Sequence, residues 1–160
     1  MIKRFKQGDT APDFIITASN GNEVSLSTFL GTPLILFFYP KNTAKDCVSL
    51  LSGFRDLFSD FKKEKVRLVG ISVETLDSHN KFIAKYRIPF LLLCDTNMKM
   101  CRQYGVYRPR KVAGTKVWGV ARTTFVVDKN GKIVKIYENI KDSDHAKEVL
   151  SFMRTSFRNL

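Results

Sequence analysis

The sequence LILFFYPKNTAKDC, residues 34–47, leads from an apolar run across a short polar loop to a cysteine. The run, residues 34–39, is β-branched and aromatic without polar alternation, which is typical of a strand covered on both faces. It ends at Pro40, and beyond Cys47 apolar residues recur at helical spacing as far as Phe61. The segment therefore predicts a buried strand, a loop and a helix that begins near the cysteine.

Cys47 is the first candidate for chemistry. A thiol in the first turn of a helix lies near backbone N–H groups that have no partner within the helix, and their field favours the thiolate. The thiolate is the nucleophilic form of cysteine. A small buried hydrophobic role is equally consistent with the strand, loop and helix alone, so both interpretations stay open at this point.

Length and composition predict a single domain over residues 1–160, since 44% of the residues are hydrophobic and no linker or repeat divides the chain. The cysteines, Cys47, Cys94 and Cys101, match neither a disulfide framework nor a zinc site, which favours a reducing compartment. No apolar signal segment follows the basic N-terminus, and no apolar run is long enough to span a bilayer. We therefore expect a cytoplasmic protein with no metal, no cofactor and no membrane partner.

The charge is strongly basic, with 27 Lys and Arg against 15 Asp and Glu and a net charge of +12. No acidic residue lies between Asp95 and Asp128, whereas seven basic residues do. This predicts a basic surface region that steers an anionic partner or binds nucleic acid non-specifically. The chain has no zinc-finger spacing, RNA-recognition signature or helix-turn-helix pattern, so a specific nucleic-acid partner is not expected and a solvated basic face is favoured.

After residue 61, apolar strands and amphipathic helices alternate along the chain. The expected elements are a strand at 66–74, a helix at about 78–86, a strand at 90–94, a short helix at 98–104 ending at Gly105, a basic loop at 107–117, two strands in TTFVVDKNGKIVKIY around a tight Asn130-Gly131 turn, and a helix at about 143–154 capped by Asp142 or Ser143. This order predicts an α/β fold whose sheet has a parallel core with helices packed on it.

Several motifs occur in an order known from one protein family. They are GDTAPDF, GNEVSLSTFLG, FFYPKNTAKDC, GISVETLDSHNKF, IPFLLLCDT, YGV, ARTTFVVDKNGKI and HAKEVL. In these motifs the chain resembles a peroxiredoxin of the bacterioferritin-comigratory (PrxQ) group over nearly its whole length. The resemblance implies a thioredoxin-like fold, a central mixed β-sheet flanked by helices, and reduction of hydrogen peroxide or organic hydroperoxides by a cysteine.

The resemblance also implies catalytic residues. Cys47 matches the peroxidatic cysteine, whose thiolate attacks a peroxide oxygen and becomes a sulfenic acid. Arg122 matches the arginine that holds the thiolate and donates to the peroxide, although by spacing alone it is a surface arginine of the basic region. Pro40 matches the proline that ends the strand and shapes the loop.

The loop departs from the family motif P-x-x-x-T-x-x-C. The threonine position is Ala44, and Lys45 replaces the usual proline. Thr43, one place earlier, supplies the catalytic hydroxyl only if the loop is re-formed, and is otherwise a loop residue or a helix cap. Asp46 opposes thiolate formation, while Lys41 and Lys45 favour it.

The second departure concerns turnover. Many members carry a resolving cysteine five residues after the first, where this chain has Ser52. We therefore expect a one-cysteine cycle in which thioredoxin, glutaredoxin or a small thiol such as glutathione reduces the sulfenic acid. Cys94 and Cys101 are expected to be buried structural cysteines. The two histidines, His79 and His145, are expected to be caps or packing residues and not bases.

Other functions stay open beside the thiol peroxidase, which we expect to be a monomer or weak dimer. A degenerate, weakly active peroxiredoxin acting as a redox sensor or binding module is the main alternative, because the hydroxyl and resolving positions are both altered. A thiol–disulfide oxidoreductase of the thioredoxin type is disfavoured because the chain has no C-x-x-C motif.

Overall fold

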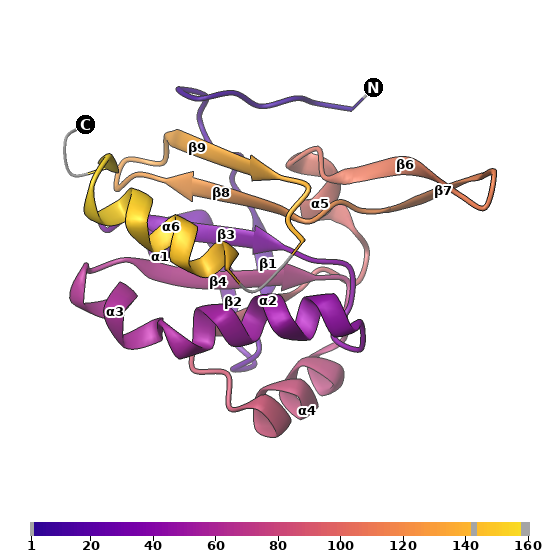
Figure 1. The fold of residues 1–160 in the computed structure, drawn as a ribbon, viewed down its shortest axis with the longest axis horizontal. Coiled ribbons are helices and arrows are strands. Elements are labelled where there is room, and N and C mark those ends of the chain that lie inside the picture. The colour runs from indigo at the N-terminus through magenta and orange to yellow at the C-terminus, as the bar shows by residue number, and fades with distance from the viewer. Residues whose placement is uncertain (1, 142–143, 158–160) are drawn as a thin grey trace.

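The fold is built on a mixed β-sheet, seen in a computed structural model that describes residues 2–141 and 144–157. Within these residues the sheet has five strands in the order β5-β4-β3-β8-β9. They are β3 (Leu34–Phe38), β4 (Arg67–Ser72), β5 (Leu91–Cys94), β8 (Thr123–Val127) and β9 (Ile133–Glu138). Strands β3, β4 and β5 run parallel, whereas β8 is antiparallel to β3 and β9 to β8 (Figure 1). The expected parallel core of an α/β sheet is confirmed.

Helices cover both faces of this sheet. One face carries α2 (Lys45–Asp56), α3 (Phe58–Lys63), α4 (Leu76–Tyr86) and α6 (His145–Arg154), and the other carries α1 (Leu26–Phe29), α5 (Lys99–Gln103) and the hairpin of β1 (Ile15–Thr17) and β2 (Glu23–Ser25). Each face of the sheet has its own apolar cluster. Along β3, Ile35 and Phe37 belong to the cluster on the α2 face, and Leu34, Leu36 and Phe38 belong to the cluster on the α5 face. The strand is therefore buried on both faces, as its unbroken apolar run predicted. Both clusters are built on one sheet, which supports the proposal of a single domain.

Aromatic packing fixes α2 against the sheet. The rings of Phe37 and Phe54 stack with centroids 4.4 Å apart and an interplanar angle of 10°. Gly70 on the neighbouring strand makes room for this stack, because a Cβ atom there would lie 2.8 Å from the Phe37 ring and 2.8 Å from Leu92. The expected helix after Cys47 is interrupted at Leu57, so α3 is a separate helix. The ring of Phe61 in α3 still packs near that of Phe54, with the ring centroids 5.8 Å apart.

The expected basic loop at 107–117 is wrong. The structure has a hairpin of β6 (Tyr107–Val112) and β7 (Thr115–Val120), which projects from the body of the molecule (Figure 1). Its two-residue turn places Ala113 at φ 52° and Gly114 at φ 81°, as a primed hairpin turn requires. Alanine rarely takes this conformation, so the sequence lacked the Asn-Gly or Asp-Gly signal that normally marks such a turn.

The other boundaries differ in smaller ways. The expected tight Asn130-Gly131 turn is wrong, since Gly131 has a positive φ of 88° but Asn130 does not. The loop is longer, and Oδ1 of Asp128 accepts hydrogen bonds from the backbone N–H groups of Asn130 and Lys132. Gly105 follows α5 with φ 69°, as expected. The two expected caps of the last helix, Asp142 and Ser143, lie outside the described residues, and Asp144 occupies the N-cap position.

Candidate active site

Cys47 lies in the first turn of α2, just past the carboxyl end of β3. The helix begins at Lys45 with Ala44 as its N-cap residue, so Cys47 is the third helical residue. Its side chain is 0% exposed and belongs to the apolar cluster beneath α2. First-turn N–H groups lack acceptors within the helix and stabilise a negative charge placed beside them. The expected position of this thiol in a first helical turn is confirmed.

Arg122, directly before β8, reaches the same helical turn. Its Nη2 lies 3.5 Å from Oδ2 of Asp46, the residue before Cys47. Its Nε is buried and has no hydrogen-bond partner among the described residues. A buried donor without an acceptor costs about 1–3 kcal/mol, so this nitrogen marks a place where an additional acceptor, such as a substrate oxygen, would be stabilised. Pro40 and Arg122 line the same hollow, so the structure brings these expected site residues together.

Thr43 is not at the N-cap of α2. It lies exposed in the turn before the helix, and its hydroxyl has no hydrogen bond within the described part of the chain. Ala44 occupies the cap position, where its methyl group leaves the helix without a side-chain cap hydrogen bond. A threonine at position 44 would offer its hydroxyl to the first-turn N–H groups, a cap worth about 1 kcal/mol. Among the alternatives for Thr43, the exposed turn favours a loop residue.

A buried amide, that of Asn42, anchors the loop that precedes Cys47. Asn42 Oδ1 accepts a hydrogen bond from the Tyr39 hydroxyl at 2.8 Å. Its Nδ2 donates to Ser78 Oγ at 3.2 Å and to His79 Nδ1 at 3.1 Å. The Asn42 backbone N–H donates to Glu74 Oε1 at 3.1 Å. The loop is therefore held to the start of α4 by groups more than thirty residues away in the sequence.

His79 is held in its neutral form by this network. Because Nδ1 accepts from Asn42, the ring proton is on Nε2, which donates to the Leu93 carbonyl at 3.0 Å. Burial lowers the pKa of His79 from its usual 6.5, although the Leu93 carbonyl and Glu74 act in the opposite direction. Burial also raises the pKa of Tyr39, and negative charge on Cys47, Glu74 or Cys94 would raise it further. Tyr39 therefore stays a hydrogen-bond donor.

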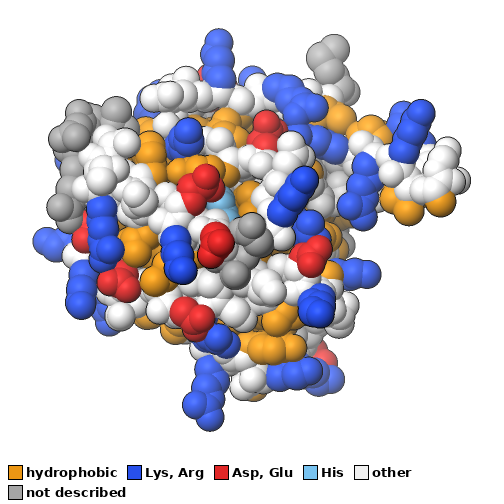
Figure 2. All heavy atoms as spheres, in the orientation of Figure 1, with side chains coloured by type: hydrophobic (Ala, Val, Ile, Leu, Met, Phe, Trp, Pro, Cys, Tyr) orange, Lys and Arg blue, Asp and Glu red, His pale blue; other side chains and the backbone are white. Residues whose placement is uncertain are grey.

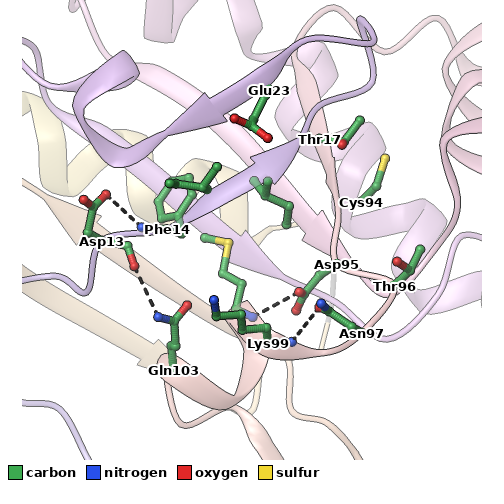
Figure 3. Close-up of a pocket in the computed structure, with 13 residues that line it drawn as sticks. Asp13, Phe14, Thr17, Glu23, Cys94, Asp95, Thr96, Asn97, Lys99 and Gln103 are labelled. Carbon is green, nitrogen blue, oxygen red and sulfur yellow. Dashed lines mark hydrogen bonds between the residues drawn. The ribbon is translucent and has the colours of Figure 1, made fainter.

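The other two cysteines lie on or near a second hollow of ≈ 420 Å³, beside β1 and α5. Cys94 lines it together with Asp95 and Asn97 (Figure 3). Burial raises the pKa of Cys94. Cys101 is fully buried, and its pKa is raised by burial and then by Asp95, whose Oδ2 accepts the Cys101 backbone N–H at 2.7 Å. Both side chains disfavour the thiolate, which supports the expectation of structural cysteines.

The comparisons with known proteins agree on one family. The AhpC/TSA family matches residues 7–136. A putative peroxiredoxin bcp of Helicobacter pylori is 36% identical over 149 residues, covering 93% of this chain and 98% of its own. This chain is a peroxiredoxin of the AhpC/TSA family.

Solved structures place the peroxiredoxin in the Bcp/PrxQ group and confirm the thioredoxin-like fold. Xylella fastidiosa PrxQ superposes with a TM-score of 0.91 at 25% identity, covering 97% of this chain and 99% of that one. The bacterioferritin comigratory protein of Xanthomonas campestris superposes with a TM-score of 0.85 at 27% identity, covering 89% and 91%. Membership makes the protein a thiol peroxidase, with a peroxide substrate and a thiol reductant. None of the helices in the described ranges has the length and apolarity to cross a bilayer.

The expectation that the two histidines are caps or packing residues agrees with the structure. His145 is the first residue of α6, and its ring contacts Phe54 and Tyr137 edge-on. A ring nitrogen, Nε2, lies 2.8 Å from the Thr124 hydroxyl.

Sequence reasoning did not find Asn42 as a site residue. The signal available was weak, because Asn42 is a polar residue in a polar loop, and its partners Ser78 and His79 are far away in the sequence.

The neutral state of His79 predicts a pH dependence of stability. A lowered pKa in the folded protein means that below about pH 6.5 the unfolded chain binds a proton that the folded chain does not. The stability that the protein gains from holding His79 neutral is therefore fully present above pH 6.5. It is lost as the pH falls from there through the lowered pKa of the folded state. Urea denaturation between about pH 7.5 and 5 should show the fall. The His79→Gln variant, which cannot be protonated, should show a smaller fall, and an unchanged profile would contradict this account.

The Asp46–Arg122 pair predicts that Asp46 slows the peroxidase. Asp46→Asn removes a negative charge next to the thiolate and releases the Arg122 guanidinium for substrate. We expect Cys47 to be oxidised by hydrogen peroxide about threefold to tenfold faster, measured by stopped-flow mixing followed by mass spectrometry. Asp56→Asn, at the other end of the same helix, is the matched control and should leave the rate unchanged. A slower Asp46→Asn variant would show that the pair positions Arg122 rather than restraining it.

Proposed function

We propose that the protein reduces hydrogen peroxide and organic hydroperoxides with Cys47 as the peroxidatic residue and Arg122 as the donor to the peroxide. The observation that carries this proposal is the unpartnered, buried Nε of Arg122, a side chain whose other end is held to the helical turn containing Cys47. The Xanthomonas campestris relative is described as active in alkyl peroxide reduction, which supports an alkyl hydroperoxide as substrate.

The chemistry is a displacement at oxygen. The Cys47 thiolate attacks one oxygen of the O–O bond, forming an S–O bond while the O–O bond breaks. The sulfur is oxidised to a sulfenic acid, and the departing oxygen takes a proton and leaves as water or an alcohol. Arg122 supplies N–H donors to the oxygen on which negative charge develops and cannot lose its own charge. Pro40 shapes the loop that precedes the thiol.

Turnover is proposed to use an external thiol. Ser52 leaves α2 without a resolving cysteine, and burial makes Cys94 and Cys101 poor nucleophiles. One molecule of thiol would form a mixed disulfide with Cys47 and release water, and a second would release Cys47 and leave as the disulfide. Thioredoxin, glutaredoxin and glutathione are the proposed reductants.

The three free cysteines support action in a reducing compartment, which we propose is the cytoplasm. That the protein is a monomer or weak dimer stays a prediction.

The proposed cycle predicts where oxidation occurs first. One equivalent of hydrogen peroxide should place a sulfenic acid on Cys47 before Cys94 or Cys101, and Cys47→Ser should abolish peroxidase activity with any of the three reductants. Trapping with a sulfenic-acid reagent and peptide mass spectrometry checks the assignment. Excess peroxide should over-oxidise Cys47, because no nearby thiol captures the intermediate. A stoichiometric disulfide from Cys47 to Cys94 or Cys101 would instead show a two-cysteine cycle.

The loop predicts opposite results for two threonine variants. Ala44→Thr restores a hydroxyl and a helix cap at the N-cap position, so it should speed oxidation of Cys47, by as much as about a hundredfold if the hydroxyl acts as a preorganised donor. Thr43→Ala should change the rate little, because Thr43 is exposed in the turn. Stopped-flow rate constants at equal pH check both. A large loss in Thr43→Ala would show that this residue already supplies the donor. A parent that turns over only slowly, with Ala44→Thr restoring activity, would favour the degenerate peroxiredoxin acting as a sensor.

A further inference from the structure

A hollow of ≈ 310 Å³ opens between the β6–β7 hairpin and the start of β8. Four cationic side chains line it, namely Arg108, Arg110, Arg122 and Lys141. Among the described residues, no acidic side chain is part of this lining. Pro40 is also part of the wall, so this cationic hollow adjoins the loop that leads to Cys47. Figure 2 shows the blue basic side chains that gather on the projecting hairpin.

The hairpin geometry puts two of these arginines on one face. Side chains alternate along a strand, so Arg108 and Arg110 of β6 project to the same side. Gly119 lies opposite Arg108 in the pairing register and adds no side chain to fill the space. Lys111 and Lys116, which pair with each other, project from the opposite face of the hairpin and do not line the hollow. The positive charge of the cationic hollow is therefore a local property and not only a result of the net charge.

The four cations are neutralised only in part. Arg108 lies 3.1 Å from Glu138, which also meets Arg4 at 3.6 Å, and Arg108 Nε donates to the Gly105 carbonyl. Arg122 is paired with Asp46 at the longer distance of 3.5 Å. For Arg110 and Lys141, both exposed, no ion pair is formed with any residue in the described ranges. These two side chains are therefore available for an anion from solution.

The wall of the same hollow is also apolar. Pro40 and Ile140 line it, and Ile140 is 7% exposed. A substrate with an organic body and an anionic group would contact both kinds of surface. Hydrogen peroxide, with no charge and no carbon, would use neither. Arg122 joins this hollow to the thiol, because it lines the hollow and is paired with the residue before Cys47.

We propose that the cationic hollow selects organic hydroperoxides that carry a carboxylate or phosphate group, which Arg110 and Lys141 bind while the hydroperoxide group reaches Cys47 beside Arg122. This inference rests on the proposed function and names its substrate class. The Cys47 thiolate takes the terminal oxygen of the hydroperoxide and becomes a sulfenic acid. The O–O bond breaks, and the inner oxygen takes a proton and leaves as the alcohol, still bearing its anionic group.

The test compares two hydroperoxides that differ in one charge. The second-order rate constant of Cys47 oxidation is measured by stopped-flow mixing with 4-carboxycumene hydroperoxide and with its methyl ester. Electrostatic attraction at a cationic site should make the acid about tenfold faster than the ester at low salt, and the ratio should fall towards one as salt is added. Inhibition by inorganic phosphate or by benzoate at constant ionic strength shows which anion the hollow prefers, and inhibition by neither would count against an anion site.

Two pairs of variants locate the effect. Arg110→Gln and Lys141→Gln should each lower the ratio of acid to ester about threefold. Lys111→Gln and Lys116→Gln, on the opposite face of the hairpin, remove the same charge and should leave both rate constants unchanged. An equal loss in these controls would assign the effect to net charge and overturn the proposal.

The remaining outcomes separate this proposal from the proposed function. Equal rate constants for acid and ester would overturn the substrate class and leave the peroxidase in place. Failure of both hydroperoxides to oxidise Cys47 would overturn the proposed function itself. If Arg110→Gln slows only the later reduction of oxidised Cys47 by glutathione, the hollow receives the reductant and the proposal is wrong.

Discussion

The hydrogen bonds of the Asn42 amide are the constraint on which the site depends. This one side chain joins the end of β3, through Tyr39, to the start of α4, through Ser78 and His79. These bonds, with that of the Asn42 backbone N–H to Glu74, fix the loop between β3 and α2 and so support the first turn of the helix. A buried polar network of this kind is rigid only when every member is satisfied. The neutral His79, the protonated Tyr39 and the ionisable Glu74 supply complementary donors and acceptors.

The first turn of α2 combines features that oppose one another. Its backbone N–H groups and Arg122 are donors that would stabilise an added negative charge, whereas Asp46 already carries a negative charge in this turn and engages Arg122. The N-cap lacks the hydroxyl that would add a donor at the same place. The fold that holds the Cys47 thiol is thus intact, but its hydrogen-bond donors differ from those of the family motif. The hydroxyl at position 44 is missing, and the Arg122 guanidinium is paired with Asp46. If Cys47 is the peroxidatic residue, as we propose, its reactivity depends on the balance of a few charges in this turn rather than on the scaffold.

The sequence predicted features whose causes are local. The run from Leu34 to Tyr39 has no polar alternation, so it indicated a doubly buried strand, and helical spacing after Cys47 indicated α2. The β6–β7 hairpin was missed because its turn uses Ala113 in a conformation that glycine or asparagine normally takes. The Asn42 network was missed for a different reason. Apart from Tyr39, its partners are more than thirty residues away, and no local pattern shows that a loop asparagine will be buried.

The β6–β7 hairpin has a further consequence, for self-association. Within the described residues its strands pair only with each other, so each has an outer edge of backbone groups exposed to solvent. Such edges recruit strands from other molecules and begin aggregates. Pro109 lacks an N–H to offer, and the charged side chains along the hairpin repel a second copy of the same edge. The cations that give this region its charge thus also protect a projecting ribbon, with its exposed Val112 and Trp118, from intermolecular β-sheet formation.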